Sequence, residues 1–358
     1  MHYFIFTSKD SYITEDSPGH IILYPDSTDR NYGVDEIIEL KKEFVNSYST
    51  SSYNVSRMLT QFDYSDVSAS IVNGDITNPK FYLRYYEVEG QQELNKTYSL
   101  SSYPLSQSWE EGVGRQYHNP PEKNGVSWES GSSVWTLSGG DWISGSGYEA
   151  SQSFTNQSGD MEIDVTDIVN NHLGGANQID NYGFLTKFSG SHEDDVTPLN
   201  LKFFSKNTHT IYAPKLEVRW DDSSFSVGDL TQLTMSGEFE NHIFIKGLQP
   251  KYRESEKVRF RIGCRKKYVQ KTFTESALTS SFYIPSGSGL YSIVDVTTDT
   301  PKVPFSAYTS MSCDSNSMYF DQWLNTFEPG RYYKVLFKLK YDDGQEVIID
   351  NDEEFKVI

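Results

Sequence analysis

The sequence predicts an all-β protein, and three observations support this prediction. Aromatic residues make up 15% of the 358 residues, with 25 Tyr, 21 Phe and 6 Trp, and such residues are enriched in strands. Ala and Leu, which favour helices, are scarce, whereas Ser, Thr, Asn and Gly are abundant. Short runs of alternating apolar and polar residues recur between turn-forming residues, which is typical of strands with one buried face. We therefore expect β-sandwich architecture.

The alternating runs define the expected strands. In the first part of the chain they occupy residues 3–6, 21–24, 81–86, 199–204 and 216–220, and in the second part residues 257–262, 282–284, 291–296 and 332–339. Near the end, residues 334–340 and 346–349 flank Asp342-Asp343-Gly344, a turn sequence that predicts a hairpin. About seven strands fit the length of the second part.

Two segments of the first part are less regular. Residues 33–44 fit a strand and a helix almost equally, and we favour a strand. Residues 164–173 predict a short helix, because Asp164 or Thr166 can cap an apolar stripe that Gly174-Gly175 ends. The Ser/Gly/Trp-rich region from about residue 100 to 160 predicts ordered aromatic loops at one end of a sandwich.

Length and charge predict two domains of different character. At roughly 150 residues per domain the chain has room for about two. Residues 1–224 carry 15 basic and 32 acidic side chains, a net charge of −17, whereas residues 225–358 carry 16 and 18, a net charge of −2. We place the boundary at 221–228, with domains at 1–222 and 225–358. The overall charge of −19 disfavours sequence-independent binding to nucleic acid.

The two cysteines and the N-terminus bear on the compartment. Cys264 and Cys313 are too few for a disulfide scaffold or a thiolate zinc site. The first residues lack a basic segment and a long apolar run, and no later stretch approaches 18 apolar residues. We expect synthesis in a host cytoplasm, no signal peptide and no membrane insertion.

Five motifs in order along residues 1–221 carry a family resemblance. They are Asn31-Tyr32-Gly33; residues 56–63 with Arg57 and Phe62-Asp63; Ser108-Trp109-Glu110-Glu111-Gly112 followed by Pro120-Pro121 and Gly125-Val126-Ser127-Trp128; residues 163–169; and Asn181-Tyr182-Gly183-Phe184 followed by residues 214–218. Together they resemble the DNRLRE-type domain, which implies a jelly-roll β-sandwich related to carbohydrate-binding modules. The polar pair Thr60-Gln61 before Phe62 and the long Trp-rich loop depart from the family pattern.

The C-terminal part carries a second resemblance. Residues 283–286, 291–293, 318–323 and 327–335 are similar to terminal domains of structural proteins from large tailed bacteriophages. This resemblance implies a non-enzymatic virion protein of the tail, baseplate or neck that binds neighbouring virion subunits, as a symmetric homo-oligomer. The alternatives are a carbohydrate-binding adhesin or capsid decoration protein that contacts host surface glycans, and, ranked last, a glycan hydrolase.

The first candidate interaction residues are the tryptophans of the long loop region: Trp109, Trp128, Trp135 and Trp142. Tryptophan can stack on sugar rings, anchor a protein interface or fill a small loop core. All three alternatives stay open at the level of sequence.

The second candidate group is basic. Ten basic residues lie between Lys246 and Lys271 against Glu254 and Glu256, and the group that we single out is Arg259, Arg261, Arg265, Lys266 and Lys267. We favour an acidic protein partner through charge complementarity over solvated edge-strand residues, and nucleic acid last. Alternation places Cys264 on the inward face, as a structural thiol.

Two acidic segments suggest chemistry that we do not adopt. Glu110-Glu111 could act as a glycosidase pair, but adjacent carboxylates point in different directions. Residues 192–195 with Asp180 offer oxygen ligands for Ca²⁺, but such charge runs are usually solvated turns. We expect no catalytic residue, no metal site and no cofactor.

Overall fold

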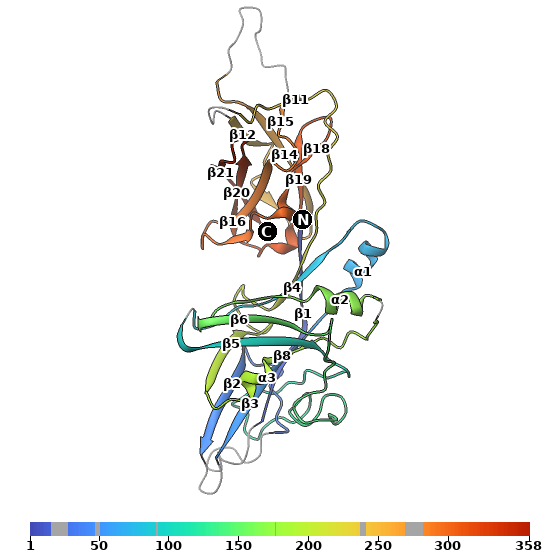
Figure 1. Cartoon of the computed structure of the whole chain (residues 1–358), viewed down its shortest axis with the longest axis vertical. Coiled ribbons are helices and arrows are strands. Elements are labelled where there is room, and N and C mark those ends of the chain that lie inside the picture. The colour runs from blue at the N-terminus through green and yellow to red at the C-terminus, as the bar shows by residue number, and fades with distance from the viewer. Residues whose placement is uncertain (16–27, 47–50, 91, 176, 237–240, 269–281) are drawn as a thin grey trace, which may run out of the picture. The chain divides into compact units, whose positions relative to one another are not determined.

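A computed structural model describes residues 1–15, 28–46, 51–90, 92–175, 177–236, 241–268 and 282–358 (Figure 1). The chain forms two compact units. The N-terminal unit comprises Ile5–Val72 and Lys80–Val218, and the C-terminal unit comprises Met1–Phe4, Asn73–Pro79 and Arg219–Ile358. The all-β prediction is confirmed. Among the described residues, no helix is both long enough and apolar enough to cross a membrane.

The unit boundaries differ from the predicted division at 221–228, because Met1–Phe4 and Asn73–Pro79 group with the C-terminal unit. Long-range polar contacts hold the first residue there. The Met1 amino group donates to the carbonyl oxygens of Trp220 and Tyr308, both at 2.5 Å, and lies 3.2 Å from Asp222. These partners are more than 200 residues away in sequence, so no local pattern indicates them.

The N-terminal unit is built on a curled antiparallel sheet with the order β6-β5-β8-β3-β1-β10-β4-β7, to which β2 and β9 add beside β3. The strands are β1 (His2–Thr14), β2 (Ile37–Asn46), β3 (Ser51–Phe62), β4 (Lys80–Tyr85), β5 (Glu93–Pro104), β6 (Ala150–Gln157), β7 (Met161–Asp164), β8 (Phe184–Phe188), β9 (Leu199–Phe204) and β10 (Lys215–Arg219). The strand prediction within 33–44 is confirmed by β2. The predicted run 21–24 lies outside the described residues. The jelly-roll connectivity stays a prediction.

Three short helices accompany this sheet: α1 (Ser65–Val72), α2 (Thr166–His172) and α3 (Gly190–Glu193). The predicted helix is α2. The predicted cap is wrong, because the N-cap position is Val165, which makes no side-chain cap bond. Asp164 Oδ1 instead accepts the N–H of Thr166 at 3.0 Å, and Gly174 beyond the end of the helix has φ +101°. The sequence did not predict α1, in which Val67 is the buried residue, because one buried residue produces no helical periodicity.

The C-terminal unit is a β-sandwich. One sheet has the order β12-β14-β19-β18 and the other β13-β21-β20-β16-β17, with β11 and β15 as an additional pair. The bounds are β11 (Thr231–Gln232), β12 (Asn241–Lys246), β13 (Lys251–Tyr252), β14 (Lys257–Lys266), β15 (Phe282–Tyr283), β16 (Gly289–Asp295), β17 (Pro301–Val303), β18 (Ser312–Cys313), β19 (Met318–Trp323), β20 (Tyr332–Lys340) and β21 (Glu346–Val357), with 3₁₀ turns at Ala307–Thr309 and Leu324–Thr326.

The strand count in this unit exceeds the prediction of about seven, since the described residues contain eleven strands. Five of them, β11, β13, β15, β17 and β18, are only two or three residues long. The predicted run 282–284 corresponds to β15, and the other four are too short for alternation to reveal. The predicted hairpin is confirmed: β20 and β21 pair antiparallel, and Gly344 in the turn has φ +84°.

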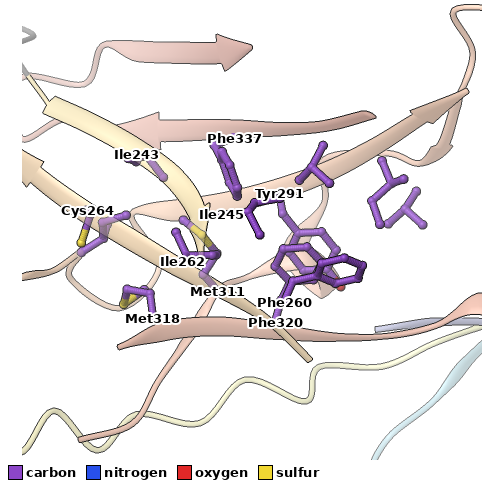
Figure 2. Close-up of a cluster of buried hydrophobic side chains, with 14 of the residues drawn as sticks. Ile243, Ile245, Phe260, Ile262, Cys264, Tyr291, Met311, Met318, Phe320 and Phe337 are labelled. Carbon is purple, nitrogen blue, oxygen red and sulfur yellow. The ribbon is translucent and has the colours of Figure 1, made fainter. Parts of the chain in front are cut away.

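The core of this sandwich lies between its two sheets, and Figure 2 shows part of it. Tyr291 stacks on Phe320 with ring centroids 3.9 Å apart, and Phe260 stacks on Phe320 with ring centroids 5.0 Å apart. Phe260 and Phe320 are cross-strand partners on β14 and β19, so the opposite face of these strands points away from the core. That outward face carries Arg259, Arg261 and Arg265 of the predicted basic group, whereas Lys266 and Lys267 lie at and beyond the end of β14.

Candidate functional site

Three of the four candidate tryptophans lie in a local core of the N-terminal unit. Trp109, Trp128 and Trp135 are 1%, 6% and 4% exposed and pack in one apolar cluster. The indole N–H of Trp109 donates to the carbonyl oxygen of Tyr182, and that of Trp135 to the carbonyl oxygen of Ser127, both at 2.9 Å. Of the three alternatives for these residues, burial favours the loop core. We therefore withdraw them as interaction residues.

Trp142 is partly buried against the same cluster and takes part in a charged network. The Arg57 guanidinium lies between two indoles, 4.8 Å from the ring centre of Trp128 and 5.0 Å from that of Trp142. Arg57 also forms a two-point ion pair with Glu193, at 2.9 and 3.2 Å, and donates to the Gly139 carbonyl oxygen at 2.6 Å. One side chain of β3 thus joins the Trp-rich loop to α3.

The acidic segment 192–195 is held by cations of the protein itself. Glu193 pairs with Arg57 and Lys187, and Asp195 pairs with Lys42 and Lys96. Burial acts to raise the pKa of Glu193, but Arg57 and Lys187 outweigh it and lower that pKa. Within the described residues no group of three or more His, Cys, Asp or Glu side chains is placed to hold a metal. These ion pairs connect the segment to β2, β3, β5 and β8.

Asn31 fixes the first half of the long loop. Its side chain is buried and donates to the carbonyl oxygens of Glu111 at 2.7 Å and Val126 at 2.9 Å. Its Oδ1 accepts the N–H groups of Gly114 at 2.7 Å and Gly33 at 3.2 Å. Three of these four bonds connect a residue before β2 with two loop segments that follow β5, and the fourth, from Gly33, is local.

Asn181 acts in the same way before β8. It donates to the Phe62 carbonyl oxygen at 2.8 Å and accepts the Gly183 N–H at 3.2 Å. Two motifs of the pattern Asn-Tyr-Gly, far apart in sequence, therefore have one structural role. The two asparagines of these motifs position the chain around the loop region, and this role explains their residue type without reference to a ligand.

The adjacent residues Glu110 and Glu111 have different surroundings. Glu110 is exposed and lies 3.6 Å from Lys9, whereas Glu111 accepts the N–H of Asp10 at 3.0 Å and contacts Lys206 at 2.7 Å. Burial, followed by the nearby Glu111 charge, raises the pKa of Asp10 to about 7, although the backbone N–H and charge of Lys206 oppose this. Glu110 and Glu111 thus have separate structural partners.

The basic candidates Arg259 and Arg261 lie on the outer face of β14. Arg259 forms a two-point ion pair with its cross-strand partner Asp321, with both distances 2.8 Å, and Arg261 pairs with Asp314 at 2.6 Å. The phenol ring of Tyr319 lies between them, 4.1 Å from the Arg259 guanidinium and 5.3 Å from that of Arg261. Nearby, Lys257 lies over Trp323 at 5.5 Å. The charges of Arg259 and Arg261 are therefore partly neutralised by carboxylates, and aromatic rings lie beside the cations of this strand.

The same strand ends in Arg265, Lys266 and Lys267. Arg265 is half-buried and donates to the carbonyl oxygens of Lys266 and Lys267, whose side chains are exposed. The inward prediction for Cys264 is confirmed: the thiol is buried, donates to the Phe282 carbonyl oxygen at 2.9 Å, and burial raises its pKa to about 12. Such a thiol is unreactive at neutral pH.

We define the outer face as the outward side chains of β12, β14 and β19: His242, Phe244, Lys246, Lys257, Arg259, Arg261, Arg265, Tyr319, Asp321 and Trp323. Sequence reasoning found its arginines but missed Phe244, Tyr319 and Trp323, because their surface role depends on which strands pair. The alternation of β19 indicates that Tyr319, Asp321 and Trp323 share a face, but not that this face adjoins β14.

These features define a protein of two all-β units. One has an aromatic loop core held by Asn31, Arg57 and Asn181, and the other is a sandwich whose outer face carries cations beside partly buried aromatic side chains. In comparisons with known proteins, no family model matches the chain and no curated protein matches it. The DNRLRE-type and tailed-phage resemblances therefore stay predictions.

Proposed function

We propose that the protein is a non-enzymatic structural component of a tailed-phage particle, in the tail, baseplate or neck, and that it binds neighbouring particle proteins. The motif resemblances support the particle context. The observation that carries the binding role is the outer face of the C-terminal unit. Tyr, Trp and Arg are enriched at protein interfaces, and here they lie together on one sheet surface.

The electrostatics of the outer face favour an acidic partner. Lys246 lies directly across from Arg261, and His242 directly across from Arg265. Lys246 and Arg261 are like charges, which repel each other in such a cross-strand position. Asp321 and Asp314 balance only Arg259 and Arg261. Burial, Arg265 and Lys267 lower the pKa of His242, which is consistent with a local excess of positive charge. Carboxylates of a partner would relieve this repulsion.

We assign the partner as the acidic N-terminal part of a second copy of the chain. Residues 1–224 carry a net charge of −17, whereas residues 225–358 carry −2, so a contact between unlike parts is electrostatically favoured over a contact between like parts. A head-to-tail contact of this kind forms a closed ring when its rotation closes. Rings are the symmetry expected of a tail, baseplate or neck component.

Sedimentation velocity of the purified protein at low and high salt tests the self-association. We expect oligomers at 50 mM salt that dissociate at 500 mM, since surface charge attraction is screened. The variant Lys246→Glu with Arg265→Glu removes two cations that make no ion pair among the described residues, and it should sediment as a monomer. Lys251→Glu, an exposed charge change on β13, is the matched control and should associate as the wild type does. Association that is equal in both variants would refute the assignment of the face.

Particle membership is tested separately. Mass spectrometry of purified virions should detect the protein at a copy number that is a multiple of the ring symmetry, and its gene should lie among tail or neck genes. Absence of the protein from purified particles would refute the virion role. Point variants are preferable to deletion of residues 225–358, because Met1–Phe4 and Asn73–Pro79 belong to the same unit as those residues.

A further inference from the structure

A cavity of about 390 Å³ opens on the N-terminal unit beside the turn that precedes β8. Its volume is in the range of small-ligand sites. The residues that line it are Leu105, Ser106, Ile143, Gln178, Ile179, Asp180 and Tyr182. They come from three separate segments: the end of β5, the far side of the Trp-rich loop, and the segment between α2 and β8.

The aromatic residue of this cavity is held in place on both sides. The Tyr182 carbonyl oxygen accepts the indole N–H of buried Trp109 at 2.9 Å, and the backbone N–H of Tyr182 donates to the Asp180 carbonyl oxygen at 3.1 Å. The preceding residue, Asn181, donates through its side chain to the Phe62 carbonyl oxygen at the end of β3, and the Leu105 N–H donates to the Gly183 carbonyl oxygen at 3.0 Å. A ring presented on such a turn loses little freedom when it binds a ligand.

The polar groups of the cavity suit a hydroxylated ligand. The Tyr182 hydroxyl donates to Asp180 Oδ2 at 3.1 Å, which orients the carboxylate and leaves its other lone pairs for further donors. The Gln178 amide and the Ser106 hydroxyl each offer a donor and an acceptor. Leu105, Ile143 and Ile179 supply the apolar surface between these groups.

Charge narrows the ligand class. Asp180 is the charged residue among those that line the cavity, and no Lys or Arg is among them. A phosphate, sulfate or carboxylate ligand would meet a like charge without a compensating cation, which is unfavourable. A purely apolar ligand would cover the Asp180 carboxylate and offer no hydrogen bond to the lone pairs that Tyr182 leaves free, at a cost. A neutral ring with one apolar face and several hydroxyl groups satisfies both conditions.

We propose that this cavity binds a neutral saccharide residue, with one face of the sugar ring on Tyr182 and its hydroxyl groups bonded to Asp180 and Gln178. The site goes beyond the proposed assembly role and uses none of the outer-face residues. It also differs from the four tryptophans first considered for sugar binding, because burial removes three of them and none of the four lines this cavity.

A printed array of neutral and acidic oligosaccharides, probed with the full-length protein, tests the proposal. We expect binding to neutral oligosaccharides in preference to sialylated or sulfated ones. The tightest hit is then titrated by calorimetry. Tyr182→Ala should weaken binding at least tenfold, Asp180→Asn about threefold to tenfold, and Tyr182→Phe only about threefold because the ring stays.

Controls separate loss of the site from loss of the fold. Gln178 is exposed, so Gln178→Ala should lower affinity without a change in melting temperature. Tyr117→Ala removes a 69% exposed aromatic side chain elsewhere in the same unit and should leave affinity unchanged. Absence of any array signal for the wild type, or equal affinity in Tyr182→Ala and Gln178→Ala, would overturn the proposal. Self-association should be normal in all these variants, so the saccharide site and the assembly face can fail independently.

Discussion

Replacement of Asn31 by alanine should destabilise the N-terminal unit strongly and locally. The buried amide makes four hydrogen bonds, to the carbonyl oxygens of Glu111 and Val126 and from the N–H groups of Gly33 and Gly114. A net value of about 1 kcal/mol per bond gives a loss of about 4 kcal/mol in the free energy of unfolding. That loss is a large fraction of the roughly 5–15 kcal/mol by which a domain is stable.

Asn31→Asp sharpens the test, because it preserves shape. The carboxylate can still accept the N–H groups of Gly33 and Gly114, but it turns a second oxygen towards the carbonyl groups of Glu111 and Val126, where the amide had donated. The folded state therefore disfavours the ionised form and raises the pKa of the new carboxyl group. Stability should be highest at acidic pH, where this group is protonated, and should fall as the pH rises through the raised pKa.

Urea unfolding combined with hydrogen exchange measures the effect. Exchange should rise in the peptides that contain residues 110–126, and the tryptophan emission should shift to the red because Trp109, Trp128 and Trp135 lie in the loop core. Asn124→Ala, an exposed asparagine of the same loop, is the matched control and should change stability by less than about 0.5 kcal/mol. A loss under 1 kcal/mol in Asn31→Ala, with unchanged exchange at 110–126, would refute the reasoning.

Three further predictions concern the same unit. Asp10→Asn removes a titrating group whose pKa is raised to about 7. Because the folded state favours the protonated form of Asp10, the free energy of unfolding of the wild type should fall by up to about 4 kcal/mol relative to that of the variant between pH 4 and pH 8. A constant difference in melting temperature across that range would contradict this prediction. Gly125→Ala places a methyl group 2.6 Å from Asn31 Nδ2 at a residue with φ +127°, and it should lower the free energy of unfolding in urea by about 3 kcal/mol. Gly145→Ala, at φ +122° with open space around it, should lower that free energy by only about 1 kcal/mol. Equal losses in the two variants would exclude the steric explanation. Arg57→Lys keeps the charge but loses the two-point pairing with Glu193 and the stacking on the indoles of Trp128 and Trp142. Thermal unfolding should therefore show a loss of about 2 kcal/mol in the free energy of unfolding. A melting curve like that of the wild type would contradict the role of Arg57 in joining the loop to α3.

The sequence predicted the features that depend on neighbours along the chain. Alternation located β4, β9, β10, β14, β16 and β20 within a few residues, because burial of one face imposes a period of two on any strand long enough to repeat it. The turn Asp342-Asp343-Gly344 marked the hairpin, and Asp164 and Gly174 marked the ends of α2. The same alternation placed Cys264 inside. β11, β13, β17 and β18 were missed because two or three residues contain at most one full repeat of period two.

The role of the tryptophans was decided by contacts that cross the chain. Trp109, Trp128 and Trp135 meet in one core because Asn31, Arg57 and Asn181, from three distant segments, fix the loop around them. Their composition alone allows a sugar platform, an interface or a core, and only burial distinguishes these. Tyr182 belonged to a motif predicted to be a tight turn, and its place in the lining of a cavity follows from packing on Trp109.

By itself, then, the sequence determined the all-β class, the positions of the longer strands and the unequal charge of the two parts, since each is a local or additive property of the chain. Only the tertiary structure decided which charges and rings are available at the surface. Glu193 and Asp195 are neutralised by lysines and an arginine from other strands, and Arg259 and Arg261 by Asp321 and Asp314. Ion pairing and burial act between groups close in space, and proximity in space is set by strand order and register, which no residue specifies alone.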